Sequence, residues 1–376
     1  MKNPEKIRLS QQQKEEKDWL KWGPYLSERQ WGTVREDYSA GGDAWNYFPH
    51  DHARSRAFRW GEDGIAGISD RYCNMCFSIG LWNGKDPILK ERLFGLTGPQ
   101  GNHGEDVKEL YYYLENTPSH SYMKYLYKYS QKAYPYNQLI TENQKRNRKE
   151  LEFELLDTGI FDDNTYFDVS TEYAKGDETD ILIKITIINR SNQAAPITLL
   201  PQMVMRNHWT FKEMSRKPVI TKKGTKTNPF VHIDHPYVGS YNLYFQKAAQ
   251  LFFTENETNR KKVYSDTNDH PFKKDLFNDA VCNNDFELAT KNSSGTKFAP
   301  LYQEIIGGGE SKTFQLRLTE ETLNTPFSDF DAIFKARQEE CAQFYEEIAP
   351  KATIDRKAIL KPVSYTHLTL PTTPYV

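Results

Sequence analysis

The sequence predicts a mainly β protein: a sandwich of antiparallel sheets followed by one long helix. Between Leu151 and Leu318, short apolar runs alternate with period 2 and are separated by turn residues, which is typical of half-buried strands. After Thr325 the apolar spacing changes to that of an amphipathic helix. The length of 376 residues favours two domains or one large, elaborated domain, and 14% aromatic residues can supply its core.

Composition and charge exclude several classes of protein. The 49 Lys and Arg residues nearly cancel the 51 Asp and Glu residues, so the chain lacks the basic footprint of a nucleic-acid-binding protein. No apolar run reaches the length of a membrane span, and the charged N-terminus lacks the apolar core of a secretory signal. Four Cys are too few for a disulfide framework. We therefore expect a cytoplasmic protein with reduced thiols and neither a nucleic-acid nor a membrane partner.

The N-terminal part of the chain divides into two segments. Residues 1–21 are predicted to form a polar helical lead-in. Residues 22–104 are crowded with Trp, Arg, Asp, His and Gly and keep neither strand nor helix periodicity for long. Such sequence is typical of loops that carry a site, although an irregular segment packed over a core would look similar. We expect a β-sandwich domain over residues 22–320, with long site-facing loops over residues 22–104.

The clearest strand prediction covers residues 180–190, in which one face carries Ile181, Ile183, Ile185 and Ile187. Turn residues follow, and residues 195–207 are predicted as the returning strand. Pro201 inside that strand indicates an edge position or a bulge, because proline cannot donate to a sheet.

Two further segments support the sandwich. Residues 240–246 and 250–256 flank a tight connection and are predicted as another hairpin. In residues 310–320, Phe314, Leu316 and Leu318 share one face. Short antiparallel strands at this spacing predict two sheets packed face to face.

The C-terminal part is predicted to be a linker helix over residues 327–360. Ser328 and Asp331 resemble a capping box, and Pro350 ends the helix. Its apolar stripe, which must pack on the sandwich or on a further domain, consists of Phe330, Ile333, Phe334, Cys341, Phe344, Tyr345 and Ile348. Residues 362–376 contain no Asp, Glu, Lys or Arg, so we interpret residues 361–376 as a foreign tail and expect the natural chain to be truncated there.

The stretch from Trp31 to Gly64 is the most informative for function. It interleaves aromatic rings with carboxylates and guanidinium groups, a mixture suited to sugars, because rings stack on the C–H face and planar charged groups bind hydroxyls. A structural network of ion pairs between loops would use the same residues. The residues that we predict to line a substrate cleft are Trp31, Arg35, Glu36, Asp37, Tyr38, Trp45, His50, Asp51, Arg54, Arg59, Glu62 and Asp63.

Other motifs are weaker. The pairs His50–His52 and His232–His235 invite a metal interpretation, but neither completes a ligand set with recognisable spacing, so we predict no metal. The motif Cys73-x-x-Cys76 lacks a second pair and is interpreted as two buried thiols. The glycine-rich stretch at residues 98–104 lacks the Lys and Ser/Thr of a phosphate loop. We therefore predict no cofactor.

Three blocks of the sequence, Lys21–Asp70, Leu81–Tyr136 and Glu152–Lys175, together resemble the N-terminal part of the bacterial glucosidase-like proteins of glycoside hydrolase family 63. These proteins are relatives of processing mannosyl-oligosaccharide glucosidase. The resemblance extends roughly from Trp19 to Leu360 and is most specific in the first two blocks. It implies an N-terminal β super-sandwich, linker helices and a C-terminal (α/α)6 barrel that carries the catalytic carboxylates.

The resemblance also implies inverting hydrolysis of α-glucosidic or related α-linked sugars, with one acid and one base carboxylate. The chain ends where the linker helix would lead into the barrel, so no catalytic residue can be transferred to it. We expect a fragment that is inactive alone, with a carbohydrate and the absent barrel as its partners. The alternatives are a free-standing carbohydrate-binding or interaction module and an enzyme that uses Glu36, Glu62 or Glu105.

Overall fold

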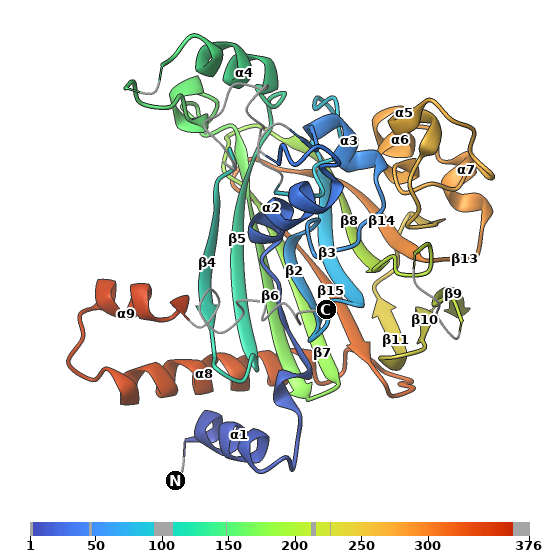
Figure 1. The fold of residues 1–376 in the computed structure, drawn as a ribbon. Coiled ribbons are helices and arrows are strands. Elements are labelled where there is room, and N and C mark those ends of the chain that lie inside the picture. Colours follow the sequence, from blue (N-terminus) through green and yellow to red (C-terminus); the bar gives the residue numbers. More distant parts are fainter. Residues whose placement is uncertain are drawn as a thin grey trace.

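The computed structural model describes residues 3–44, 47–93, 108–147, 149–211, 216–225 and 227–363, apart from the side chains at positions 31, 32 and 37. Two antiparallel sheets dominate this part of the chain (Figure 1). In spatial order, the first sheet contains β1 (Trp22–Pro24), β2 (Ile65–Asp70), β3 (Met75–Trp82), β8 (Ala195–Met205), β14 (Lys297–Ile306) and β12 (Gln250–Thr254). The second contains β13 (Ser294–Gly295), β9 (Val219–Gly224), β10 (Pro229–His235), β11 (Gly239–Phe245), β15 (Ser311–Thr319), β7 (Asp180–Asn189), β6 (Tyr166–Asp177), β5 (Tyr122–Ser130) and β4 (Tyr111–Asn116).

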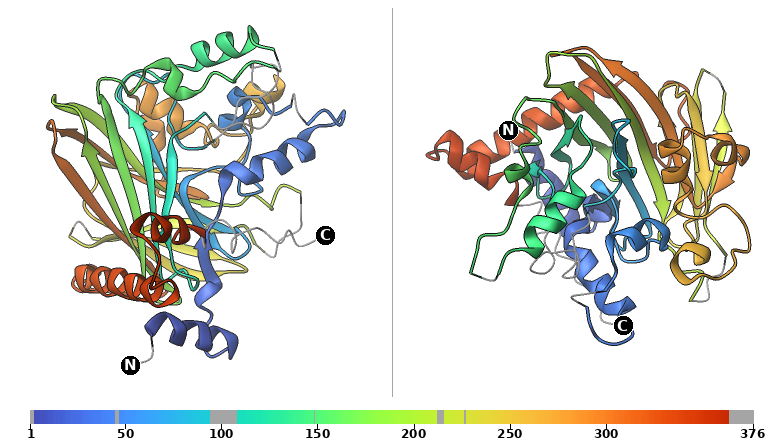
Figure 2. Two further views of the ribbon diagram at one scale, coloured as in Figure 1. Left: turned by 90° about the vertical axis from the view of Figure 1, so that its left-hand side faces the viewer. Right: turned by 90° about the horizontal axis from the view of Figure 1, so that it is seen from above.

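Helices cover the ends and edges of the sandwich, as the two views of Figure 2 show. They are α1 (Pro4–Gln13), α2 (Ser27–Tyr38), α3 (His50–Ser55), α4 (Tyr136–Gln144), α5 (Arg260–Tyr264), α6 (Leu276–Cys282), α7 (Glu287–Lys291), α8 (Phe330–Ile348) and α9 (Ile354–Leu360), with 3-10 turns η1 (Trp19–Lys21) and η3 (Leu155–Thr158). Within the described residues, none of these helices is long and apolar enough to cross a membrane.

The main core lies between the two sheets. The isoleucines of residues 181–187 that alternate in the sequence are all fully buried there. Phe77 of the first sheet meets Tyr173 of the second edge to face, with ring centroids 6.2 Å apart. In the β7–β15 ladder, Ile183 faces Leu316 and Ile185 faces Phe314. The predicted mainly β sandwich is therefore confirmed, and its apolar residues lie on the faces that the period-2 pattern indicated.

Both predicted hairpins are wrong. After β7 the chain crosses to the first sheet to form β8, and after β11 it crosses to form β12. Turn residues show that the chain reverses, but a reversed strand can bury its apolar face equally well beside its predecessor or opposite it.

The prediction for Pro201 is also wrong. The strand β8 lies inside its sheet between β3 and β14, and its register with β14 is the same before and after Pro201. In that register Pro201 stands opposite Pro300, at a gap in the paired residues. Because neither proline has an N–H, the ladder is interrupted without a bulge.

The interpretation of residues 22–104 as loops missed β1, β2 and β3. Almost every residue of β2 and β3 is buried. A strand that is covered on both faces has no reason to alternate apolar and polar residues, so period 2 is lost. Conversely, the strand-rich region from Leu151 to Leu318 contains α5, α6 and α7, of which α6 and α7 form a small cluster around Phe252 and Phe277.

The predicted linker helix forms as α8 and packs back on the sandwich. Its buried stripe contacts Tyr122, Ala174 and Leu182 on the outer face of the second sheet. Figure 1 shows α8 crossing the lower end of β5–β7. The capping box is absent, because Asp329 is the N-cap residue and the Ser328 hydroxyl donates to Thr325 O. Of the predicted foreign tail, residues 364–376 lie outside the described residues.

In its described part the lead-in is helical in α1 and in the 3-10 turn η1, and it is not a loose arm. Glu5 is fully buried, and its carboxylate accepts hydrogen bonds from Ser119 N at 2.7 Å and Ser121 Oγ at 2.9 Å. Lys175, also fully buried, donates from Nζ to the carbonyl oxygens of Trp19 and Trp22. These buried polar contacts fix the entry of the chain into β1.

Candidate functional site

The segment from Ser27 to Asp63 leaves the first sheet after β1 and rejoins it at β2; we call it the α2–α3 excursion. Its two ends are held together, because Ser27 Oγ donates to Gly64 O at 2.7 Å and the Tyr25 hydroxyl donates to Asp63 O at 2.7 Å. Glycine makes this closure possible: a Cβ at position 67 would lie 2.4 Å from the Tyr25 ring. The excursion is therefore closed at its base and projects from one end of the sandwich (Figure 1).

The excursion has a small core of its own. Val34 of α2 packs with Phe48 and Ala53, and the Tyr38 ring stacks on Phe48 with centroids 5.3 Å apart and planes 10° from parallel. These contacts hold α2 against α3.

Five of the predicted cleft residues lie on the outer side of the excursion: Glu36, Tyr38, Asp51, Arg54 and Arg59. Glu36 is exposed, and Asp51 forms an ion pair with Arg54 at 3.0 Å. The guanidinium of Arg59 lies 4.7 Å from the Phe211 ring centroid and donates to Thr210 Oγ1 at 2.9 Å. The structure thus brings aromatic and charged side chains together on this surface.

Four others point inward: Arg35, His50, Glu62 and Asp63. Arg35 donates from Nε to Tyr47 O at 3.2 Å. The His50 ring packs on Tyr136 with centroids 4.8 Å apart, and burial, together with Lys90 and Arg92, keeps its pKa well below the ordinary value. Glu62 accepts hydrogen bonds from the backbone N–H groups of Arg59 and Trp60.

The remaining predicted residues cannot be placed. The side chains of Trp31 and Asp37, and all of Trp45, lie outside the described residues, as do residues 98–104 and Glu105. Their assignment to a substrate cleft stays a prediction, as does that of the placed residues.

Asp63 belongs to a buried network of ion pairs beneath the excursion. Its carboxylate accepts from Arg92 Nε at 2.8 Å and forms an ion pair with Lys274 Nζ. Glu91 joins the same network through Arg92 at 2.7 Å and Lys297 at 2.9 Å. Charges of both signs therefore meet where α2–α3, β3, β14 and α6 converge.

The neighbouring carboxylates Glu62 and Asp63 have opposite pKa shifts. Burial raises the pKa of Glu62, and the adjacent Asp63 charge adds to that effect. Burial also acts upward on Asp63, but the attraction of Arg92 and Lys274 outweighs it and holds the pKa of Asp63 below the ordinary value. Asp63 is therefore the stable anion of the pair, while Glu62 more readily keeps a proton.

Among the described residues, the cavity beside this network has room for about one water molecule. This cavity of about 10 Å³ is lined by residues that include Tyr25, Asp63, Glu91 and Lys274. The ion pairs of this network can fix the base of the α2–α3 excursion in place and keep Asp63 ionised. The cavity offers no room for a sugar ring.

Sequence reasoning missed Arg92, Lys274, Glu91 and Lys297, which hold the excursion in place. In the sequence, Arg92 and Glu91 belong to a stretch without strand or helix periodicity. Lys274 and Lys297 lie more than 200 positions from Asp63. It also missed Tyr264 and Phe211, which lie beside Arg56 and Arg59 on the outer surface. No local spacing joins residues so far apart, so only folding reveals them.

The histidine motifs have structural partners. His232 Nδ1 lies 3.0 Å from Asn242 Oδ1, and His235 Nδ1 accepts from Tyr237 N at 3.2 Å. Burial and the nearby Arg216 lower the pKa of His235 to about 4. Cys73 and Cys76 are free thiols, but only Cys76 is buried as predicted, while Cys73 is partly exposed.

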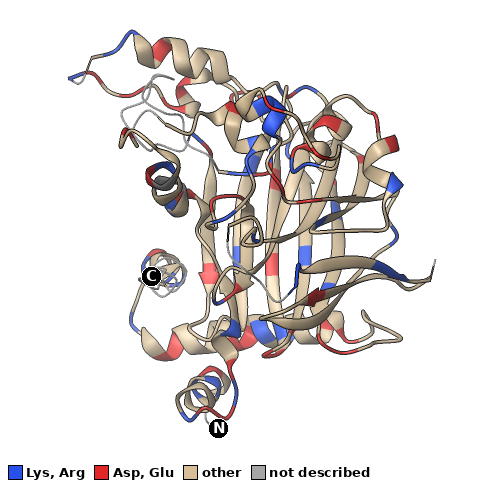
Figure 3. Cartoon of the chain, turned by 45° about the vertical axis from the view of Figure 1, so that its right-hand side comes forward, with Lys and Arg blue, Asp and Glu red and all other residues tan. Residues whose placement is uncertain are grey.

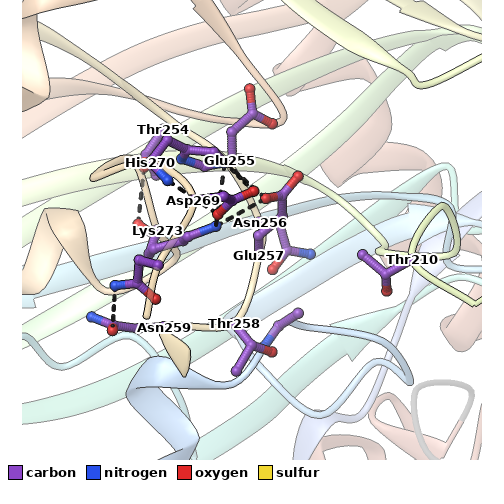
Figure 4. A network of polar contacts seen from close by, with 12 residues as sticks. Thr210, Thr254, Glu255, Asn256, Glu257, Thr258, Asn259, Asp269, His270 and Lys273 are labelled. Atoms are coloured by element: carbon purple, nitrogen blue, oxygen red, sulfur yellow. Dashed lines mark hydrogen bonds and ion pairs between the residues drawn. The ribbon is translucent and has the colours of Figure 1, made fainter. Parts of the chain in front are cut away.

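One cluster in the described residues has metal-like ligands: Glu257, Asp269 and His270 (Figure 4). Lys273 reaches into it, with Nζ 2.5 Å from Asp269 Oδ1 and 3.2 Å from Glu257 Oε2. The same ammonium lies 3.2 Å from His270 Nε2. Because a lysine already supplies the positive charge there, the cluster gives no support for a metal ion.

Charge over the rest of the molecule is mixed. In the view of Figure 3, Lys and Arg are interspersed with Asp and Glu along strands and helices. This distribution agrees with the near-zero net charge of −2.

No family model matches the sequence. The chain is 41% identical over 391 aligned positions to the uncharacterized protein YMR196W of Saccharomyces cerevisiae. The match covers 92% of this chain but 36% of the yeast protein, so the chain spans about a third of its relative's length.

Solved structures resemble the chain only distantly. A family GH92 α-mannosidase from Bacteroides thetaiotaomicron is similar over 86% of this chain and 35% of its own, with a TM-score of 0.31 and 11% identity. A polysaccharide lyase is similar over 72% of this chain and 28% of its own, with the same TM-score and identity. At these TM-scores the likeness carries no argument about activity.

Proposed function

We propose that this chain is the N-terminal β-sandwich part of an inverting α-glucosidase-type glycoside hydrolase that acts on α-linked sugars. In this proposal it supports and lines the cleft of a helical catalytic barrel carried by a further part of the same protein. The barrel would supply one carboxylic acid to protonate the leaving oxygen and one carboxylate to activate water.

A single observation carries the proposal. The sequence block that resembles family 63 most specifically folds as the α2–α3 excursion, a projection closed at its base by Ser27 and Tyr25. On its outer side the guanidinium of Arg59 lies over the Tyr38 ring, and Glu36 is exposed on the same helix as Tyr38. Flat rings and planar charged groups on a rigid support are what sugar recognition requires.

The same geometry argues against catalysis by the excursion alone. Glu62 has the raised pKa of a general acid, but its carboxylate is enclosed and already accepts two backbone N–H groups. A general acid must reach the leaving oxygen within hydrogen-bonding distance. Glu36 is exposed but lies on α2 without a second acid established opposite it.

The test is an activity assay on the purified 376-residue chain. With p-nitrophenyl α-glucoside and α-linked disaccharides as substrates, we expect no turnover from the chain alone. A longer protein that includes the proposed barrel should hydrolyse at least one of them with inversion. Turnover by the chain alone that Glu36→Gln or Glu62→Gln abolishes would overturn the proposal and favour catalysis by this domain.

A free-standing carbohydrate-binding module is the second candidate, because exposed rings lie beside Arg56 and Arg59. Tyr264 is 55% exposed and Phe211 is 52% exposed. Calorimetric titration of the chain with maltose and isomaltose separates the candidates. Binding that Tyr264→Ala removes, and that Tyr237→Ala on the distant β10–β11 turn leaves intact, would favour the module; no binding would favour the dependent domain.

A further inference from the structure

Three arginines on the surface around the α2–α3 excursion have no carboxylate partner among the residues that the structure describes. Arg56, Arg59 and Arg206 lie close together: Arg56 and Arg59 both lie over the Tyr38 ring, and Arg206 donates from Nε to Arg59 O. Among the described residues, none of the three makes an ion pair. Other buried arginines do so, as Arg92 does with Asp63 and Arg317 with Asp180.

Their contacts are instead with rings and neutral oxygens. Arg56 donates from Nη1 to the Tyr264 hydroxyl at 2.8 Å and from Nη2 to the Tyr47 hydroxyl at 3.0 Å. Arg206 lies 5.1 Å from the Trp60 ring centroid and donates from Nη1 to Tyr72 O at 2.9 Å. These contacts orient the guanidinium groups, and the described part of the chain supplies no carboxylate that pairs with their positive charges.

The surface is open to a ligand at its outer edge. Arg59 and Arg206 are only partly buried, whereas Arg56 is enclosed beneath the rings. Phe211 and Tyr264 expose about half of their surface beside them. Arg56 directly follows α3, and Tyr264 is the last residue of α5. These two helices lie side by side in Figure 1.

We propose that this surface binds an anionic sugar, one that carries a phosphate or a carboxylate. The anionic group would accept hydrogen bonds from Arg59 and Arg206, whose planar donors match the oxygens of both groups. The sugar ring would lie against Phe211 or Tyr264. The anionic part of this assignment follows from the three arginines, and the sugar part rests on the proposed function.

The test titrates the 376-residue chain with glucose 6-phosphate, glucuronate, inorganic phosphate and glucose, using calorimetry at low and high NaCl. We expect at least one charged sugar to bind, glucose to bind far more weakly, and affinity to fall with added salt. Arg59→Gln should weaken binding about tenfold, the size of one lost charge-assisted hydrogen bond. Arg190→Gln is the matched control, because Arg190 pairs with Asp168 on the second sheet, away from this surface.

Three results would contradict the proposal: no binding of any charged probe, equal binding of glucose, or unchanged affinity in Arg59→Gln with intact folding by circular dichroism. Inorganic phosphate binding as tightly as both charged sugars would overturn the sugar part alone. Since none of these measurements involves hydrolysis, they fail or succeed independently of the activity assay.

Discussion

At Asp63 one carboxylate faces two buried cations, Arg92 and Lys274. Replacing it with Asn keeps the shape but removes the counter-charge. We expect Asp63→Asn to lower the free energy of unfolding by about 3–5 kcal/mol, the usual cost of leaving a buried charge unpaired. Urea unfolding measures the change. Asp51→Asn is the control, because Asp51 is exposed and its pair with Arg54 should contribute less than about 1 kcal/mol. Equal effects of the two substitutions would contradict the stabilising role of the buried network.

The buried Lys175 makes the free energy of unfolding depend on pH in a defined direction. Burial lowers the pKa of its ammonium group from 10.5 to about 7. Between these values the unfolded chain holds one more proton than the folded chain, so stability should rise with pH, by up to about 1.4 kcal/mol per pH unit. Unfolding measured from about pH 7 to 9 should show this slope, since carboxylates are already ionised there. Lys175→Met should remove the slope; an unchanged slope in that variant would assign it to another group.

At the scale of one element, the packing of α8 determines whether the C-terminal part of the chain is held against the sandwich. Phe334 is 3% exposed, stacks near Phe330 with centroids 4.9 Å apart, and lies under Lys184 Nζ. We expect Phe334→Ala to cost about 3–5 kcal/mol of unfolding free energy, because a large cavity opens against β6 and β7. Ile348 at the end of the same helix is 50% exposed, so Ile348→Ala should cost much less. A small effect of Phe334→Ala would mean that α8 detaches in solution.

At the scale of the whole molecule, both sheets share one core. Residues of β2, β3, β7, β8 and β15 all belong to the same buried cluster. We expect the 376-residue chain to unfold in one transition, with far-UV circular dichroism and tryptophan fluorescence changing together. The apolar stripe of α8 adds to this single unit, since it packs on Tyr122, Ala174 and Leu182 of the second sheet. Two separate transitions would show that part of the sandwich is independent of the rest.

Much of the fold follows from sequence pattern, because period 2 directly reports which face of a strand is buried. The isoleucines of β7 and the residues Phe314, Leu316 and Leu318 of β15 are all in the core that their spacing predicted. The stripe of α8 follows in the same way from helical spacing. The sequence also identified a stretch rich in rings and charges, which folds as the α2–α3 excursion.

Only the tertiary structure decided which strands pair and which charges meet. The placement of β7 and β8 in opposite sheets cannot be derived from a turn, because either arrangement buries the same apolar face. The doubly covered strands β2 and β3 had no periodicity to detect. Asp63 meets Lys274, and Arg56 meets Tyr264, across more than 200 positions of sequence. Local spacing carries no information about such pairs, because the packing of the two sheets brings their members together. Burial then determines how much a formed or a missing ion pair contributes to stability.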